Sequence, residues 1–168
     1  AWLQVLGGIS ETNTSGTEIS LMGSIFSFDR AQETQADLLG LKSLATSPYP
    51  SSAAANVWGN PMAEQDASAA GRKRKTTHSY NAGFTASHPT ELTRATYLAK
   101  AAQDIGDDSD DPQTHGHYDA LRSLMPRLLH NQVRMNDFGG TEYLLGAIAQ
   151  STGWTGDLLF ARGEMYQL

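Results

Sequence analysis

The chain has no cysteine, few aromatic residues (8%) and fewer basic than acidic side chains. Without cysteine it cannot form disulfides, thiolate zinc sites or cysteine nucleophiles. Its net charge of -6 argues against nucleic acid as the main partner, because binding phosphates requires a concentrated basic face. No apolar run approaches the roughly 18 residues of a membrane span, so we expect no stable membrane span in this chain. No signal segment is visible, and the first residue is Ala1 instead of Met, so we expect a processed product or part of a longer protein.

The hydrophobic periodicity predicts an all-α fold, because no segment alternates as a strand would. Residues 1–28 and 60–85 are rich in small or polar side chains, and we expect irregular or short helical pieces in the first and a loop in the second. The expected helices cover about residues 29–46, 51–58, 87–105, 117–133 (kinked at Pro126), 141–152 and 157–166. Asp29 and Gln32 form a capping-box pattern at the start of the first.

The chain divides into three expected parts. Residues 1–105 form the first, and residues 106–116 form a solvated linker. The linker's aspartates lack the spacing of a calcium-binding loop. Residues 117–168 form a tail of helical hairpins, similar to a single tetratricopeptide unit, although one pair does not establish a repeat.

Two carboxylates mark the first strong helix. Glu33 and Asp37 are four residues apart and therefore share a helix face with Leu41 and Leu44. Burying a carboxylate is costly unless it is paired or bound to a metal. The alternative is that this turn extends past the core and both acids are solvated, where they suit the helix dipole.

Three segments resemble the zinc metallopeptidases of the HtpX and CAAX-prenyl-protease type. Residues 28–41 (FDRAQETQADLLGL) resemble their second zinc motif, Glu-x-x-Ala-Asp followed by small residues and leucines. Residues 48–58 are similar to the next element, a Tyr-x-Pro turn into an alanine-rich helix that ends in Trp. Residues 84–90 resemble the Ser/Thr-His-Pro motif, and Arg94 and Tyr97-Leu98 follow it at the expected distance.

This resemblance implies roles for four residues. Glu33 would be the third zinc ligand, and Asp37 would orient a zinc-binding histidine. His88 would stabilise the negative charge that develops during catalysis, although a helix-capping role is the alternative. Arg94 would be a structural or site-supporting cation that pairs near Glu33 or with Asp37.

The family's first motif, His-Glu-x-x-His, is absent from this sequence. We expect it on a helix upstream of residue 1, where it would provide two zinc ligands and the general base. None of the five histidines can replace it, because none forms this pattern. The resemblance implies one zinc per complete site. Because the first motif is missing, we expect the isolated chain to be inactive.

The implied fold is the C-terminal helical part of a gluzincin-type peptidase domain, followed by the tail. The implied function is zinc-dependent endopeptidase hydrolysis of protein or peptide substrates in protein quality control of the bacterial envelope. The expected location is the periplasm or cell envelope, although the cytoplasm also fits. A non-catalytic helical interaction module, or an inactive remnant, is the alternative. The basic run at residues 72–75 has no interleaved aromatic residues, which favours a solvated loop over a nucleic-acid site.

Overall fold

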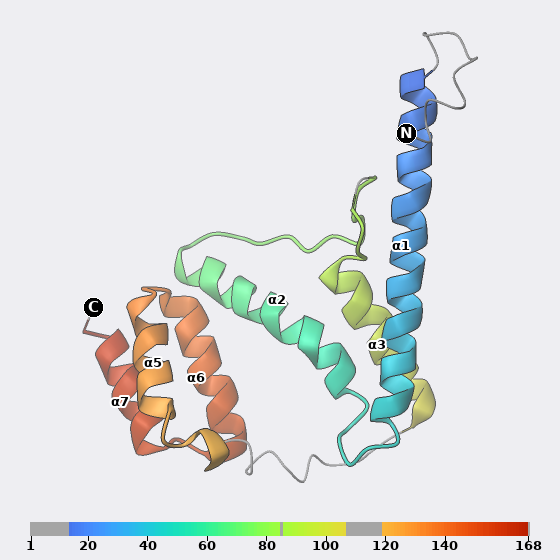
Figure 1. Ribbon diagram of the computed structural model, residues 1–168. Helices are drawn as coiled ribbons and strands as arrows, with labels where there is room; N and C mark the ends of the chain where they lie inside the picture. The colour runs from blue at the N-terminus through green and yellow to red at the C-terminus, as the bar shows by residue number, and fades with distance from the viewer. Residues whose placement is uncertain (1–13, 85, 107–118, 168) are drawn as a thin grey trace.

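A computed structural model describes residues 14–84, 86–106 and 119–167, and within these ranges it contains helices and no strand (Figure 1). The prediction of an all-α fold is therefore confirmed for the described part. The helices are α1 (Thr14–Leu44), α2 (Ala53–Gly71), α3 (Glu91–Ile105), α5 (Met125–Arg134), α6 (Phe138–Thr152) and α7 (Gly156–Met165). Among them, none is both long and apolar enough to cross a membrane.

The first helix begins much earlier than the sequence predicted. α1 starts at Thr14, so the expected start and cap at Asp29 are wrong, and Asp29 lies within the helix. Small residues such as Ser15 and Gly16 suggested irregular structure, but a helix tolerates an isolated glycine at a cost of about 1 kcal/mol. Gly23 also has a packing role, because a Cβ atom there would collide with the ring of Phe84.

The second helix is also longer than predicted, since α2 continues to Gly71 through the stretch expected to be a loop. Pro61 lies inside it and removes one backbone hydrogen bond without ending the helix. Alanine, with the highest helix propensity, is frequent in residues 63–70, and Met62 is buried. The loop begins only after Gly71.

α3 packs against both α1 and α2 and joins them into one layer of helices. Its start is capped by Thr90, whose side chain accepts a hydrogen bond from the backbone N–H of Thr93. One apolar cluster holds the three helices together. Its buried members are Leu41, Ala55, Leu98 and Ala102.

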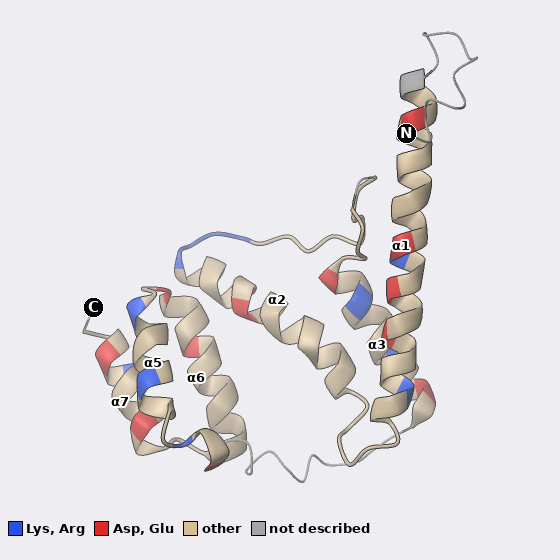
Figure 2. Cartoon of the chain, viewed as in Figure 1, with Lys and Arg blue, Asp and Glu red and all other residues tan. Residues whose placement is uncertain are grey.

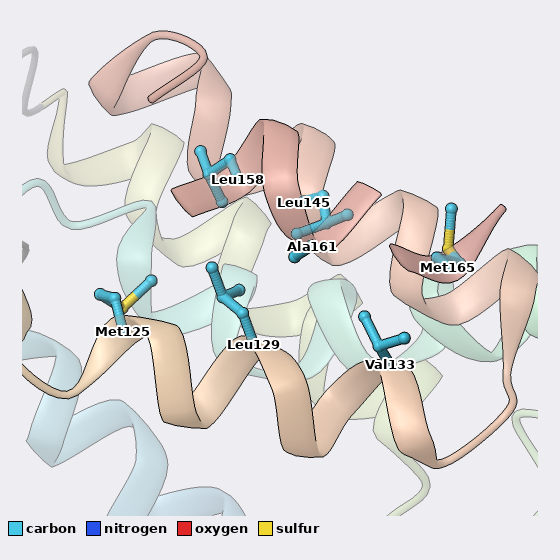
Figure 3. Close-up of a cluster of buried hydrophobic side chains, with 7 residues drawn as sticks. All are labelled: Met125, Leu129, Val133, Leu145, Leu158, Ala161 and Met165. Atoms are coloured by element: carbon cyan, nitrogen blue, oxygen red, sulfur yellow. The ribbon is translucent and has the colours of Figure 1, made fainter. Parts of the chain in front are cut away.

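The last three helices form a compact bundle with its own core (Figure 3). Seven buried side chains from α5, α6 and α7 meet there: Met125, Leu129, Val133, Leu145, Leu158, Ala161 and Met165. The residues from α5 are spaced by four, which places them on one helix face. Pro126 occupies the first turn of α5, where its missing N–H costs nothing, so the predicted kink is wrong. The expected linker and the start of the expected helix at 117 fall largely on residues 107–118, outside the described residues.

The bundle docks on α2 through α6 at a point where two glycines allow close approach. A Cβ atom at Gly139 would collide with the backbone carbonyl of Ala67, and one at Gly71 would lie 2.9 Å from the backbone nitrogen of Gly139. Backbone atoms cannot move aside as a flexible side chain can. The α2–α6 contact therefore depends on Gly139.

Gly139→Ala should lower the free energy of unfolding by about 1–3 kcal/mol, the usual cost of forcing extra volume into a packed contact. Gly146→Ala, on the same helix, is the matched control, because its Cβ would meet nothing within 4 Å. It should be neutral or stabilising by up to about 1 kcal/mol. Urea unfolding followed by circular dichroism measures both, and equal effects would contradict the close α2–α6 contact.

Candidate active site

The site lies where the C-terminal half of α1 faces the first turns of α3. Glu33 and Asp37 project from one face of α1, and Arg94 from α3 lies against both carboxylates. Asp37 and Arg94 are largely buried, with side chains 14% and 12% exposed, whereas Glu33 is 35% exposed. The interpretation that both acids are solvated is therefore wrong for Asp37.

Arg94 makes the central contacts of the site. Its Nε donates to Oδ2 of Asp37 over 2.8 Å, one Nη donates to Oδ1, and the other Nη lies 3.4 Å from Oε2 of Glu33. The guanidinium also lies over the ring of Trp58, 3.8 Å from the ring centroid. Burial disfavours the charged guanidinium, but the hydrogen bond and charge of Asp37 outweigh it and raise the pKa of Arg94. Arg94 therefore stays positively charged.

Tyr97 completes the surroundings of Asp37 by donating its hydroxyl hydrogen to Oδ2. Burial and this hydrogen bond raise the pKa of Tyr97 to about 12. The hydroxyl therefore stays protonated at neutral pH and remains a donor. With Arg94 and Tyr97 both donating to it, Asp37 is fixed in one orientation.

His88 lies on the other side of Glu33, with its Nδ1 atom 3.3 Å from Oε1 of that carboxylate. Its ring is 65% exposed. The segment that carries His88 is held to α1 by Arg30, which donates to the carbonyl oxygen of Ala86 over 2.5 Å. Thr90, two residues after His88, is the N-cap of α3 and accepts a hydrogen bond from the backbone N–H of Thr93.

Glu33 and His88 border an open cavity of about 470 Å³, lined also by Asp29, Gln32, Ala36 and Ser87. All four residues singled out from the sequence thus meet at one place. Glu33 contacts both His88 and Arg94, and Asp37 contacts Arg94, although more than 50 residues separate the two segments along the chain.

A model of Peptidase family M48 matches residues 7–102. The chain belongs to Peptidase family M48. Members of M48 are metallopeptidases and are generally zinc-dependent. The match covers the described parts of α1, α2 and most of α3, and it ends before the bundle of α5 to α7. Searches of curated proteins and of solved structures found no match.

Glu33 is the residue of this site that could hold a metal ion. Glu33 is a carboxylate at the edge of a cavity, partly open to solvent, which fits the oxygen donor of a catalytic zinc site. Within the described residues, no group of three or more His, Asp or Glu side chains could hold a metal ion. The described residues therefore fit a zinc site only in part.

Trp58 and Tyr97 are also part of the site, although the sequence motifs did not predict a role for either residue. Trp58 and Tyr97 reach the Arg94–Asp37 pair from two different helices, α2 and α3. The sequence holds no local signal for these contacts, because Trp58 is 36 residues from Arg94, and Tyr97 is 60 residues from Asp37. Only the packing of α2 and α3 brings them together.

Proposed function

We propose that this M48 chain provides the third zinc ligand, Glu33, and supporting groups of a zinc-dependent endopeptidase that cleaves protein or peptide substrates. The observation that carries this proposal is the arrangement around Glu33. A partly exposed carboxylate faces a cavity, while the Asp37–Arg94 pair holds the helix behind it. When bound, zinc would supply Lewis-acid polarisation of the scissile carbonyl and activation of water.

Each residue of the site has a distinct task in this proposal. Glu33 would coordinate the metal through a carboxylate oxygen, and Arg94, with one Nη 3.4 Å from Oε2, orients that carboxylate. Asp37 accepts the second N–H of a ligating histidine, since such histidines usually donate to a carboxylate. His88, exposed beside Glu33, donates a hydrogen bond to the negative charge that develops on the substrate carbonyl oxygen.

The other two ligands and the general base would come from a His-Glu-x-x-His helix in the same protein, packed beside α1. In this proposal, residues up to about 105 are the C-terminal part of a gluzincin-type domain, and the tail is a tetratricopeptide-like hairpin unit. Protein quality control in the periplasm or cell envelope would then be the physiological setting.

Removal of metal tests the proposed function. The intact protein, with a His-Glu-x-x-His segment, should bind one zinc per chain, cleave casein, lose activity with a chelator and recover it with zinc. The 168-residue chain alone should not retain zinc on dialysis, because one carboxylate is far short of three ligands. Activity of the intact protein that is indifferent to chelation would contradict the proposal and favour a helical interaction module.

His88→Ala in the intact protein should lower kcat by roughly 100-fold, the usual cost of removing a donor to developing negative charge. Zinc content should not change, and the melting temperature should barely move, because the ring is mostly exposed and Thr90 supplies the cap. His78→Ala, a second histidine that binds Asp66 outside the site, is the control and should keep kcat. A lower melting temperature with unchanged kcat would show that His88 is structural.

A further inference from the structure

A strongly basic segment follows α2 in a chain that is acidic overall. Residues 72–75 read Arg-Lys-Arg-Lys, and all four side chains are exposed. Arg72 is tethered, because it donates to Ser68 and lies 3.5 Å from Asp137. In the described part of the chain, Lys73, Arg74 and Lys75 have no salt-bridge partner, so three cations face solvent together.

The fold brings exposed apolar side chains to this segment. The Arg72–Asp137 contact places the segment beside the turn between α5 and α6 (Figure 2). Met135 in that turn is 68% exposed, and Phe138 and Tyr166 next to it are exposed as well. The rings of Phe138 and Tyr166 pack edge to face with centroids 5.0 Å apart, so these two residues form one apolar surface.

We propose that this end of the molecule, the basic segment at 72–75 together with Met135, Phe138 and Tyr166, binds the surface of an anionic lipid bilayer. Basic residues near such a surface are attracted by its negative potential, and each strengthens binding about fivefold. Exposed apolar and aromatic side chains beside them insert at the boundary between headgroups and acyl chains. The contact is peripheral and needs no membrane-spanning helix.

The arrangement favours a lipid surface over a nucleic acid. Nucleic-acid sites combine cations that follow a phosphate backbone with open ring faces on which bases stack. Here the cations are consecutive residues of one short segment, and Phe138 and Tyr166 pack on each other. Met135 is the most exposed of the three apolar side chains proposed here, and a thioether offers no face for stacking while it suits an acyl boundary.

The test is sedimentation of the full chain with vesicles of phosphatidylglycerol and phosphatidylcholine. The chain should bind these vesicles and not pure phosphatidylcholine, and salt should weaken the binding. The triple variant K73Q/R74Q/K75Q should bind about 100-fold more weakly, given about fivefold per cation. Met135→Gln should weaken binding by about fivefold, since only part of one apolar side chain is lost.

The control removes the same charge elsewhere. K42Q/K100Q/R122Q also lowers the net charge by three but changes exposed cations of α1, α3 and the segment before α5. It should retain most of the binding, with circular dichroism verifying that every variant is folded. Equal losses in both triple variants, or equal binding to neutral vesicles, would overturn the proposal. So would an oligonucleotide that binds through residues 73–75 while anionic vesicles do not bind.

Discussion

Glu33→Gln in the intact peptidase should abolish casein cleavage and lower zinc occupancy. The substitution keeps the size and shape of the side chain but removes the negative charge with which a carboxylate binds zinc. Fold stability should change little. The contacts of Glu33 with His88 and Arg94 are 3.3 Å and 3.4 Å long, and a third of the side chain is exposed. Contacts of this kind contribute about 0–1 kcal/mol.

Glu18→Gln is the matched control for this experiment. Glu18 lies on the same helix and is exposed, so its substitution changes the net charge equally and leaves the site intact. Zinc content, casein cleavage and melting temperature should be measured on one preparation of each protein. Wild-type cleavage by the Glu33 variant would show that the ligand is another residue and that the assignment from the motif is wrong.

The local pattern around the carboxylates was sufficient to predict that residues 29–44 are helical, although α1 begins earlier, at Thr14. Spacing by four predicted that Glu33 and Asp37 share a face, and the family resemblance implied that Arg94 pairs near Glu33 or with Asp37. Arg94 in fact contacts both. This result depends on the depth at which α3 packs against α1, and no local pattern encodes that depth.

Helix ends were predicted least well, and the errors have a common physical origin. Gly23 and Pro61 indicate breaks when considered alone, yet α1 and α2 pass through both. The tertiary contacts of the helix compensate the local cost in each case, with Phe84 packed on Gly23 and Met62 buried beside Pro61. Local propensity is a weak guide wherever such contacts contribute more than about 1 kcal/mol.

The surroundings of the basic segment at residues 72–75 could not be predicted from local sequence either. In sequence it lacks apolar neighbours, which favoured a solvated loop. In the structure, residues about 60 or more positions later supply them, because Gly139 allows α6 to lie close against α2. Neighbours that come from another helix bundle cannot be read from a run of adjacent residues.

Arg94→Ala should destabilise the full chain by about 3–5 kcal/mol, the cost of removing one partner from a buried ion pair. Asp37 would lose its bidentate partner while remaining largely buried, and Trp58 would lose the cation over its ring. Glu33 and Asp37 would also repel each other without the charge between them. The free energy of unfolding of Arg94→Lys should fall between those of the wild type and Arg94→Ala, since an ammonium cannot donate in a bidentate geometry.

Arg162→Ala is the comparison that isolates burial as the cause. Arg162 forms the same kind of two-nitrogen pair with Glu142 and also lies over a tryptophan ring, that of Trp154. Its side chain and that of Glu142 are 39% and 31% exposed, so solvent can replace the lost contacts and the cost should be about 1 kcal/mol. Urea unfolding of the three variants measures these differences. If Arg94→Ala and Arg162→Ala cost the same, the pair between α1 and α3 is not held in a buried site. Asp37 would then lack the fixed orientation that the proposed zinc site requires.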